Sequence, residues 1–184
     1  MRKVQRSELL DYQTYSEQRA QVQEKMFEVK RPRRVHLGEH LTFLFENHDT
    51  MWYQIQEMMR AEQLVKEEAI AHELETYNGL LGGDGVLSCS LLIEIDDRAV
   101  RAEKLRSWLP LPRHVYVELP DGKKVYAEYD RGQVGEDRLS AVQYLRFDTG
   151  GVVPVAVGCD FELVRGRVEL TAEQRRALQE DLES

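Results

Sequence analysis

The ten residues VLSCSLLIEI, at positions 86–95, decide the fold class. This short apolar run predicts a strand. The glycines just before it, at positions 82, 83 and 85, interrupt the helical pattern of the preceding chain. The stretch therefore separates a mainly helical half, residues 1–85, from a mainly β half, residues 86–165. Residues 166–184 follow as a C-terminal helix or tail.

The β half contains four further strand-like runs. HVYVEL at 114–119 and KKVYAEYD at 123–130 flank the turn PDG and predict a hairpin. LSAVQYLRF at 139–147 and VVPVAVGCDFEL at 152–163 predict a second strand pair around a Gly-Gly turn. Connections this short favour antiparallel pairing.

Two helices and a further pair of strands are predicted around these runs. TYSEQRAQVQEKMFEVK at 14–30 opens with the spacing of a capping box and predicts a helix that ends before Pro32. RRVHLGEHLTFLFEN at 33–47 predicts two short strands joined at Gly38 and Glu39. AVRAEKLRSWL at 99–109 predicts an amphipathic helix.

The remaining helical periodicity runs from 50 to 64 and from 67 to 77, which fits either one long helix or two helices with a bend near Lys66. TAEQRRALQEDLE at 171–183 predicts a capped C-terminal helix, polar enough to be a loosely attached tail. Together these elements predict an α+β fold, in which N-terminal helices pack against a largely antiparallel sheet. A chain of 184 residues is long enough for one sizeable core, so we expect a single domain.

Composition excludes several classes of protein. Hydrophobic residues make up 42% of the chain and charged residues 32%, as in a folded globular protein. The formal net charge of −8 argues against nucleic-acid binding, which needs a clustered positive field. No apolar stretch reaches the roughly twenty residues of a membrane helix, and the N-terminus lacks the apolar run of a signal peptide. We therefore expect a cytoplasmic protein, with Cys89 and Cys159 as buried apolar residues.

One helix of the N-terminal half carries an unusual set of polar residues, within FENHDTMWYQIQEMMRAE at 45–62. Its apolar face is formed by Met51, Trp52, Ile55, Met58 and Met59. Glu62 follows Ile55 by seven residues, which returns a helix to within about 20 degrees of the same direction. Glu62 is therefore expected to point towards the core, where a carboxylate needs a partner such as Lys66, Arg33 or Arg34.

Three hypotheses follow for this polar segment. Glu57 and Arg60 form a surface ion pair without functional meaning, or they line a pocket between helix and sheet with Glu57 or Glu62 as acid or base and arginines as an anion clamp. Alternatively, the polar side chains form a buried network that fixes the packing of helix on sheet. The candidate polar site comprises Glu46, Gln54, Glu57, Arg60, Glu62, Arg33, Arg34, Tyr77, Asn78 and Gln143.

Known catalytic and metal-binding spacings are missing from the sequence. Glu68 and His72 are four residues apart, where di-iron helical sites use a spacing of three, and the HExxH zinc pattern does not occur. GLLGGDGVLS matches neither a P-loop nor a dinucleotide fingerprint, and no GxSxG elbow is present. No metal site is predicted, although metal binding is kept as an alternative, and the sequence leaves open whether the protein is an enzyme and which cofactor it uses.

The elements FEN, DT, Q, EM, RAE and YN stand at positions 45–47, 49–50, 54, 57–58, 60–62 and 77–78. With ELETYNGLL and AVQYLRF, they resemble a bacterial family of uncharacterised proteins, the domain-of-unknown-function family 3501. The resemblance runs from ELLDYQTY at 8–15 to about Phe147. It implies an accessory or binding protein associated with rubrerythrin-like and iron–sulfur oxidoreductases. The two separated cysteines cannot themselves hold a four-cysteine cluster.

Overall fold

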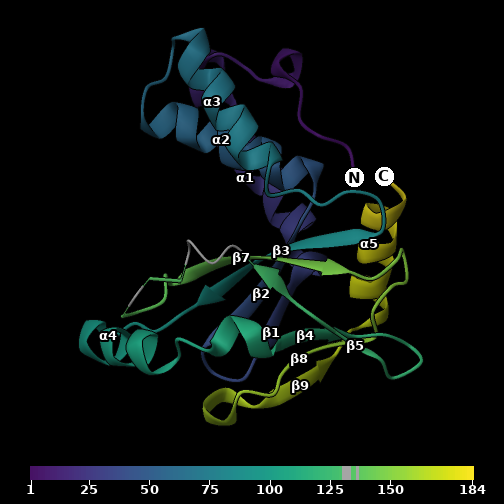
Figure 1. Ribbon diagram of the computed structural model, residues 1–184. Coiled ribbons are helices and arrows are strands. Elements are labelled where there is room, and N and C mark those ends of the chain that lie inside the picture. The colour runs from purple at the N-terminus through teal and green to yellow at the C-terminus, as the bar shows by residue number, and fades with distance from the viewer. Residues whose placement is uncertain (130–133, 136) are drawn as a thin grey trace.

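The computed structural model describes residues 1–129, 134–135 and 137–184, and its fold is α+β, as predicted. Two antiparallel sheets share a large core, three N-terminal helices stand over one of the sheets, and a C-terminal helix packs at the side (Figure 1). None of the helices in the described part of the chain is long and apolar enough to cross a membrane.

The larger sheet has the strand order β1-β2-β3-β7-β6. Its strands are β1 (Arg34–Leu37), β2 (Leu41–Glu46), β3 (Val86–Ile93), β7 (Val142–Asp148) and β6 (Glu128–Tyr129). The apolar run at 86–95 thus contains the central strand, β3, in which Cys89 lies opposite Phe45 on one side and Leu145 on the other. Because strand side chains alternate, Leu87, Cys89 and Leu91 enter the main core while Ser88 and Ser90 face the other way.

The smaller sheet has the order β5-β4-β8-β9, formed by β5 (Lys124–Tyr126), β4 (Val115–Glu118), β8 (Ala156–Cys159) and β9 (Gly166–Glu169). The predicted hairpin of β4 and β5 is confirmed. The end of the same run leaves this sheet, because β6 pairs with β7 instead, and Asp130 of the run lies outside the described residues.

The predicted pairing of 139–147 with 152–163 is wrong. The strands β7 and β8 lie in different sheets. The turn between β7 and β8 packs against the segment that precedes β3. The Gly85 carbonyl in that segment accepts hydrogen bonds from the amides of Thr149 and Gly151. Gly85, Gly150 and Gly151 all have positive φ, at 74, 60 and 81 degrees, which allows this close approach of two turns.

Three helices form a second, smaller core: α1 (Tyr12–Lys30), α2 (His48–Ala61) and α3 (Glu67–Asn78). This helical core contains Val4, Leu9, Met51, Ile55, Met59, Ile70, Tyr77 and Leu81. The α2–α3 break at residues 62–66 confirms the two-helix alternative, with Gln63 at a φ of 52 degrees. The helix α1 begins three residues after Leu9, capped by the Asp11 carboxylate rather than through Thr14 as the capping-box spacing suggested.

The helices α4 (Arg98–Ser107) and α5 (Ala172–Glu183) complete the fold. The α5 capping box of Thr171 and Gln174 is confirmed, but the expectation of a loosely attached tail is wrong. Ala177 and Leu178 are buried, and Leu178 belongs to the main core. Only a narrow apolar stripe on an otherwise polar helix makes this contact, which is why average polarity misjudged it.

Both cysteines are buried and free, as predicted. Burial raises the pKa of the Cys159 thiol to about 11, and it also raises the pKa of Cys89. Both therefore remain thiols at neutral pH and pack as small apolar side chains.

Candidate functional site

The candidate site is a cavity of about 490 Å³ between the end of α3 and the larger sheet. Its floor is formed by residues of β2, β3 and β7 that face away from the main core, including Glu46, Ser88 and Tyr144. Its rim carries the exposed side chains of Glu75, Glu128 and Arg146. A cavity of this size accommodates a small organic molecule.

Glu46 is the chemically unusual residue of this floor. It ends β2 and is only 7% exposed, and the Ser90 hydroxyl donates a hydrogen bond of 2.5 Å to its Oε1. Burial raises the pKa of Glu46, and the hydrogen bonds from Ser90 and Thr50 oppose that rise without cancelling it. A buried carboxyl group with a raised pKa keeps its proton to a higher pH than an exposed glutamate does, and such groups are candidates for proton transfer.

Two further groups shape the electrostatics around Glu46. Burial, with Tyr77 and Glu46 nearby, raises the pKa of the Tyr144 phenol, so this residue stays neutral. Lys30 lies close enough to Glu46 to interact with it through charge, while burial lowers the pKa of its own ammonium group. Both effects follow from the low polarity of the space between the helices and the sheet.

The rim of the cavity is acidic. Glu75 and Glu128 line it with two carboxylates, and Arg146 lines it with one guanidinium. Arg146 donates a hydrogen bond to the carbonyl of Gly79, just after the end of α3, so part of its hydrogen-bonding capacity is already used. This arrangement favours a ligand that carries positive charge.

Of the predicted site, the pair Glu57 and Arg60 lies on α2 outside this cavity. Glu57 accepts hydrogen bonds from the Tyr15 hydroxyl at 2.5 Å and from Arg19 Nε and Nη2, both at 2.9 Å. Burial raises the pKa of Glu57, but the hydrogen bonds from Arg19 and Tyr15 outweigh it, so the pKa is lowered overall. Arg60 is a weaker partner, with 3.8 Å between its Nη2 and Oε2 of Glu57. Glu57 therefore joins α2 to α1 through these hydrogen bonds, and the acid or base role considered for it stays a prediction.

The prediction that Glu62 points into the core is wrong. The helix ends at Ala61, and Glu62 has φ and ψ of −96 and 2 degrees, so the helical projection from Ile55 does not reach it. Its side chain is exposed, and no hydrogen bond or ion pair joins it to another residue within the described part of the chain. Arg33 and Arg34 do not approach it either, because Arg33 pairs with Asp181 and Arg34 is an exposed residue of β1.

The predicted network of Gln54, Glu62, Tyr77, Asn78 and Gln143 is not formed as a unit. Gln54 does hydrogen-bond with the Tyr77 hydroxyl. Gln143 is fully buried on the core face of β7, opposite the face that meets the helices, and its Nε2 donates to the carbonyl of Ser140. Asn78 instead binds the N-terminal segment, as described below. Gln143 cannot reach the helices because neighbouring residues of a strand face opposite sides of the sheet, and Gln143 lies on the side of the main core.

Sequence reasoning missed Ser88, Ser90 and Tyr144. The sequence of β3 did carry a signal for the two serines, because they alternate with Leu87, Cys89 and Leu91. This alternation marks a second, more polar face of the strand. Among the described residues, no group of three or more histidine, cysteine, aspartate or glutamate side chains is placed to hold a metal ion.

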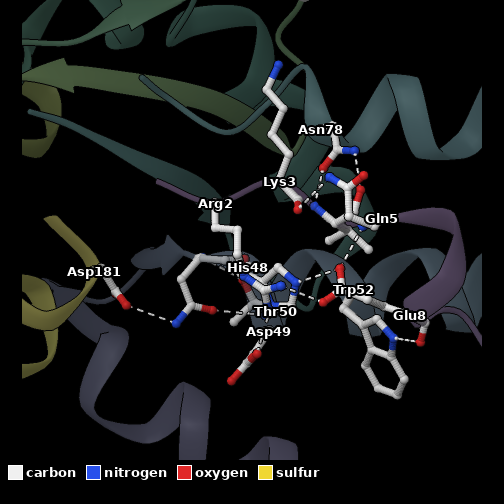
Figure 2. A network of polar contacts seen from close by, with 12 residues as sticks. Arg2, Lys3, Gln5, Glu8, His48, Asp49, Thr50, Trp52, Asn78 and Asp181 are labelled. Atoms are coloured by element: carbon white, nitrogen blue, oxygen red, sulfur yellow. Dashed lines mark hydrogen bonds and ion pairs between the residues drawn. The ribbon is translucent and has the colours of Figure 1, made fainter. Parts of the chain in front are cut away.

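The N-terminal segment, residues 1–10, forms a strap across α2 and α3, and Figure 2 shows its polar contacts. Both Nδ2 and Oδ1 of Asn78 bond the backbone of Val4, each at 2.9 Å. Trp52 Nε1 donates to the carbonyl of Glu8 at 2.8 Å, and the Glu8 carboxylate lies 3.1 Å from His48 Nε2. The strap thereby covers the helical core with Val4 and Leu9.

The Glu8 carboxylate of the strap makes the free energy of unfolding depend on pH in the acid range. The Gln5 amide, with His48 and Arg2, lowers the pKa of Glu8 from 4.5 to about 2. A carboxylate with a depressed folded-state pKa stabilises the fold fully above its unfolded pKa, and that contribution is lost as pH falls towards about 2. We expect Glu8→Gln to flatten the decline of the free energy of unfolding in this range, measured by urea titration. Glu24→Gln, an exposed change on α1, is the matched control, and equal slopes for both variants would refute the prediction.

Comparison with known proteins finds a matching family model and a similar solved structure. A family model described as a protein of unknown function (DUF3501) matches residues 3–182. A crystal structure of a protein of unknown function from Burkholderia pseudomallei superimposes with a TM-score of 0.90 at 27% identity, covering 98% of this chain and 100% of that one. No functionally curated protein matches the chain. The match over nearly the whole length confirms the predicted resemblance, and the chain belongs to the DUF3501 family of proteins of unknown function.

Proposed function

We propose that the protein binds a small, positively charged organic molecule, such as an amine, in the cavity between α3 and the larger sheet. The observation that carries this proposal is a nearly inaccessible carboxyl group, Glu46, which forms part of the floor of an open cavity of about 490 Å³. An ionisable group is costly to bury, and a nearby cation stabilises its charged form.

The rim supports the same ligand class. Glu75 and Glu128 supply two carboxylates, while Arg146 is partly engaged by Gly79. These exposed charges attract a cation from solvent, whereas the buried carboxyl group of Glu46 receives it in a less polar space.

Binding is then coupled to a proton. With its pKa raised by burial, Glu46 is more protonated than an exposed glutamate at the same pH. A bound cation lowers that pKa, so the carboxyl group ionises and a proton leaves. The ion pair that results lies where the hydroxyl of Ser90 stabilises the carboxylate through a charge-assisted hydrogen bond.

Calorimetric titration of the full chain with a small diamine such as putrescine, in two buffers of different ionisation enthalpy, tests this function. We expect saturable binding with proton release, and loss of the release in Glu46→Gln with a weakening of affinity of about tenfold or more. The matched control is Glu94→Gln, which removes one carboxylate that accepts a hydrogen bond from Thr42 outside the cavity. Equal binding by Glu46→Gln and the wild-type chain would disprove the proposal.

Association with rubrerythrin-like or iron–sulfur oxidoreductases, which the family resemblance implies, stays a prediction. The proposal of a cationic ligand rests on the cavity alone and does not depend on it.

A further inference from the structure

A second polar cluster lies at one end of the smaller sheet, away from Glu46. His114 precedes β4, Tyr126 ends β5, and Asp160 follows β8. The antiparallel pairing of β4 with both neighbours brings these three positions to the same end of the sheet. They line an open basin of about 560 Å³ together with Arg113 and Arg165.

The imidazole of His114 is held in one orientation. Its Nδ1 lies 2.8 Å from Oδ1 of Asp160, and the ring packs against Phe161 with 5.4 Å between centroids. The Tyr126 hydroxyl donates to the other carboxylate oxygen at 2.6 Å. An ionised carboxylate only accepts hydrogen bonds, so Nδ1 carries a proton and Nε2 remains for a ligand.

Asp160 is the sole carboxylate lining this basin among the described residues. The hydrogen bond from Tyr126, with His114 beside it, lowers the pKa of Asp160, so it stays ionised. Its two oxygens bind His114 and Tyr126, and among the described residues neither Arg113 nor Arg165 forms an ion pair with it.

Two guanidinium groups against one carboxylate leave the basin with a net positive charge. Arg113 Nε donates to the hydroxyl oxygen of Tyr129 at 3.0 Å, and Arg165 is exposed with no ion pair to another residue of the described ranges. By contrast, the neighbouring Arg167 on β9 forms two 2.8–2.9 Å bonds with the carboxylate of Glu118. In a chain of net charge −8, two guanidinium groups that form no ion pair within the described ranges stand out beside an oriented imidazole.

We propose that this basin binds a phosphate group, either as free phosphate or as the monoester of a small molecule. Arg113 and Arg165 supply charge and hydrogen-bond donors to its oxygens, and His114 contributes the third contact through Nε2. Two guanidinium groups supply donors to the phosphate oxygens, and Nε2 of His114 donates in the imidazolium form or, in the neutral form, accepts from the hydroxyl of a singly protonated phosphate. This set suits the three or more oxygens of a tetrahedral phosphate better than the two oxygens of a carboxylate.

The test is a titration of the isotope-labelled full chain, followed through the imidazole signals of His114 by NMR. The probes are inorganic phosphate, glycerol phosphate and acetate at constant ionic strength. We expect saturable shifts with at least one of the two phosphates and binding of acetate weaker by about tenfold. The tighter phosphate identifies the source, since glycerol phosphate presents a monoester and inorganic phosphate does not.

Paired variants separate a site from general charge attraction. Arg165→Gln is expected to weaken phosphate binding about tenfold, whereas Arg175→Gln, which removes an equally exposed arginine on α5, leaves it unchanged. Equal weakening by both variants, or shifts that never saturate, would overturn the proposal. Glu46→Gln is expected to bind phosphate normally, so failure of this proposal is distinguishable from failure of the cation site.

Discussion

Replacing Asp181 by alanine is expected to lower the free energy of unfolding by about 3 to 5 kcal/mol, the cost of leaving a buried charge without its partner. Arg33 Nε and Nη2 donate to the two carboxylate oxygens at 2.7 and 2.9 Å. The two side chains are 9% and 5% exposed. Asn47 Nδ2 also donates to Oδ1 at 2.9 Å, so a second buried donor is orphaned. Urea unfolding measures the loss.

Two companion variants show whether the charge is responsible. Glu180→Ala removes an exposed partner of Arg176 on the same helix, and such a pair contributes only about 0.5 kcal/mol. The double replacement Arg33→Met with Asp181→Leu removes both charges, and apolar pairs of similar size restore most of the stability lost on removing one. A loss below about 1 kcal/mol for Asp181→Ala would contradict the buried-pair account.

Replacing Asn78 by alanine is expected to cost about 2 to 4 kcal/mol, because it leaves the amide and the carbonyl of Val4 without partners. Val4 is 1% exposed in the helical core, so water does not readily replace those bonds. Asn78→Ala is expected to loosen the N-terminal strap before the rest of the fold is affected. Hydrogen exchange at the Val4 amide should therefore accelerate, and chemical unfolding gives the magnitude.

The controls for Asn78 are graded. Asn78→Asp keeps an acceptor for the Val4 amide but removes the donor to its carbonyl, so an intermediate loss is expected. Lys3→Ala changes an exposed residue next to Val4 and should alter stability by no more than about 0.5 kcal/mol. Unchanged exchange at Val4 in Asn78→Ala would show that these bonds do not hold the strap.

Local patterns predicted most of the elements. The apolar run that became β3 and the alternating residues that became β2 predicted strands in nearly the observed places. The pairing of β7 was mistaken because hydrophobic pattern and turn residues do not specify which strand lies beside which. The short apolar stripe of α5 was likewise hidden by the polarity of the rest of that helix.

The site was predicted less completely than the fold. Glu46 was among the candidates, but the emphasis on Glu62 assumed a helix that continued past Ala61, and the backbone turns away there. Tyr144 and Ser90 belong to strands far apart in the sequence and meet Glu46 only through sheet register. A single sequence indicates which side chains share one face of a strand, but it does not show which other elements pack against that face.

The cavity has a buried floor that is anchored in the fold and a rim of solvent-exposed side chains. Glu46 continues directly into Asn47, whose side chain is fastened to the C-terminal helix by Asp181, so the acid sits at a junction of three parts of the fold. Glu75, Glu128 and Arg146 instead extend into solvent. Under the proposed function, relatives that exchange those outer side chains would bind a different cation while keeping the same buried carboxyl group.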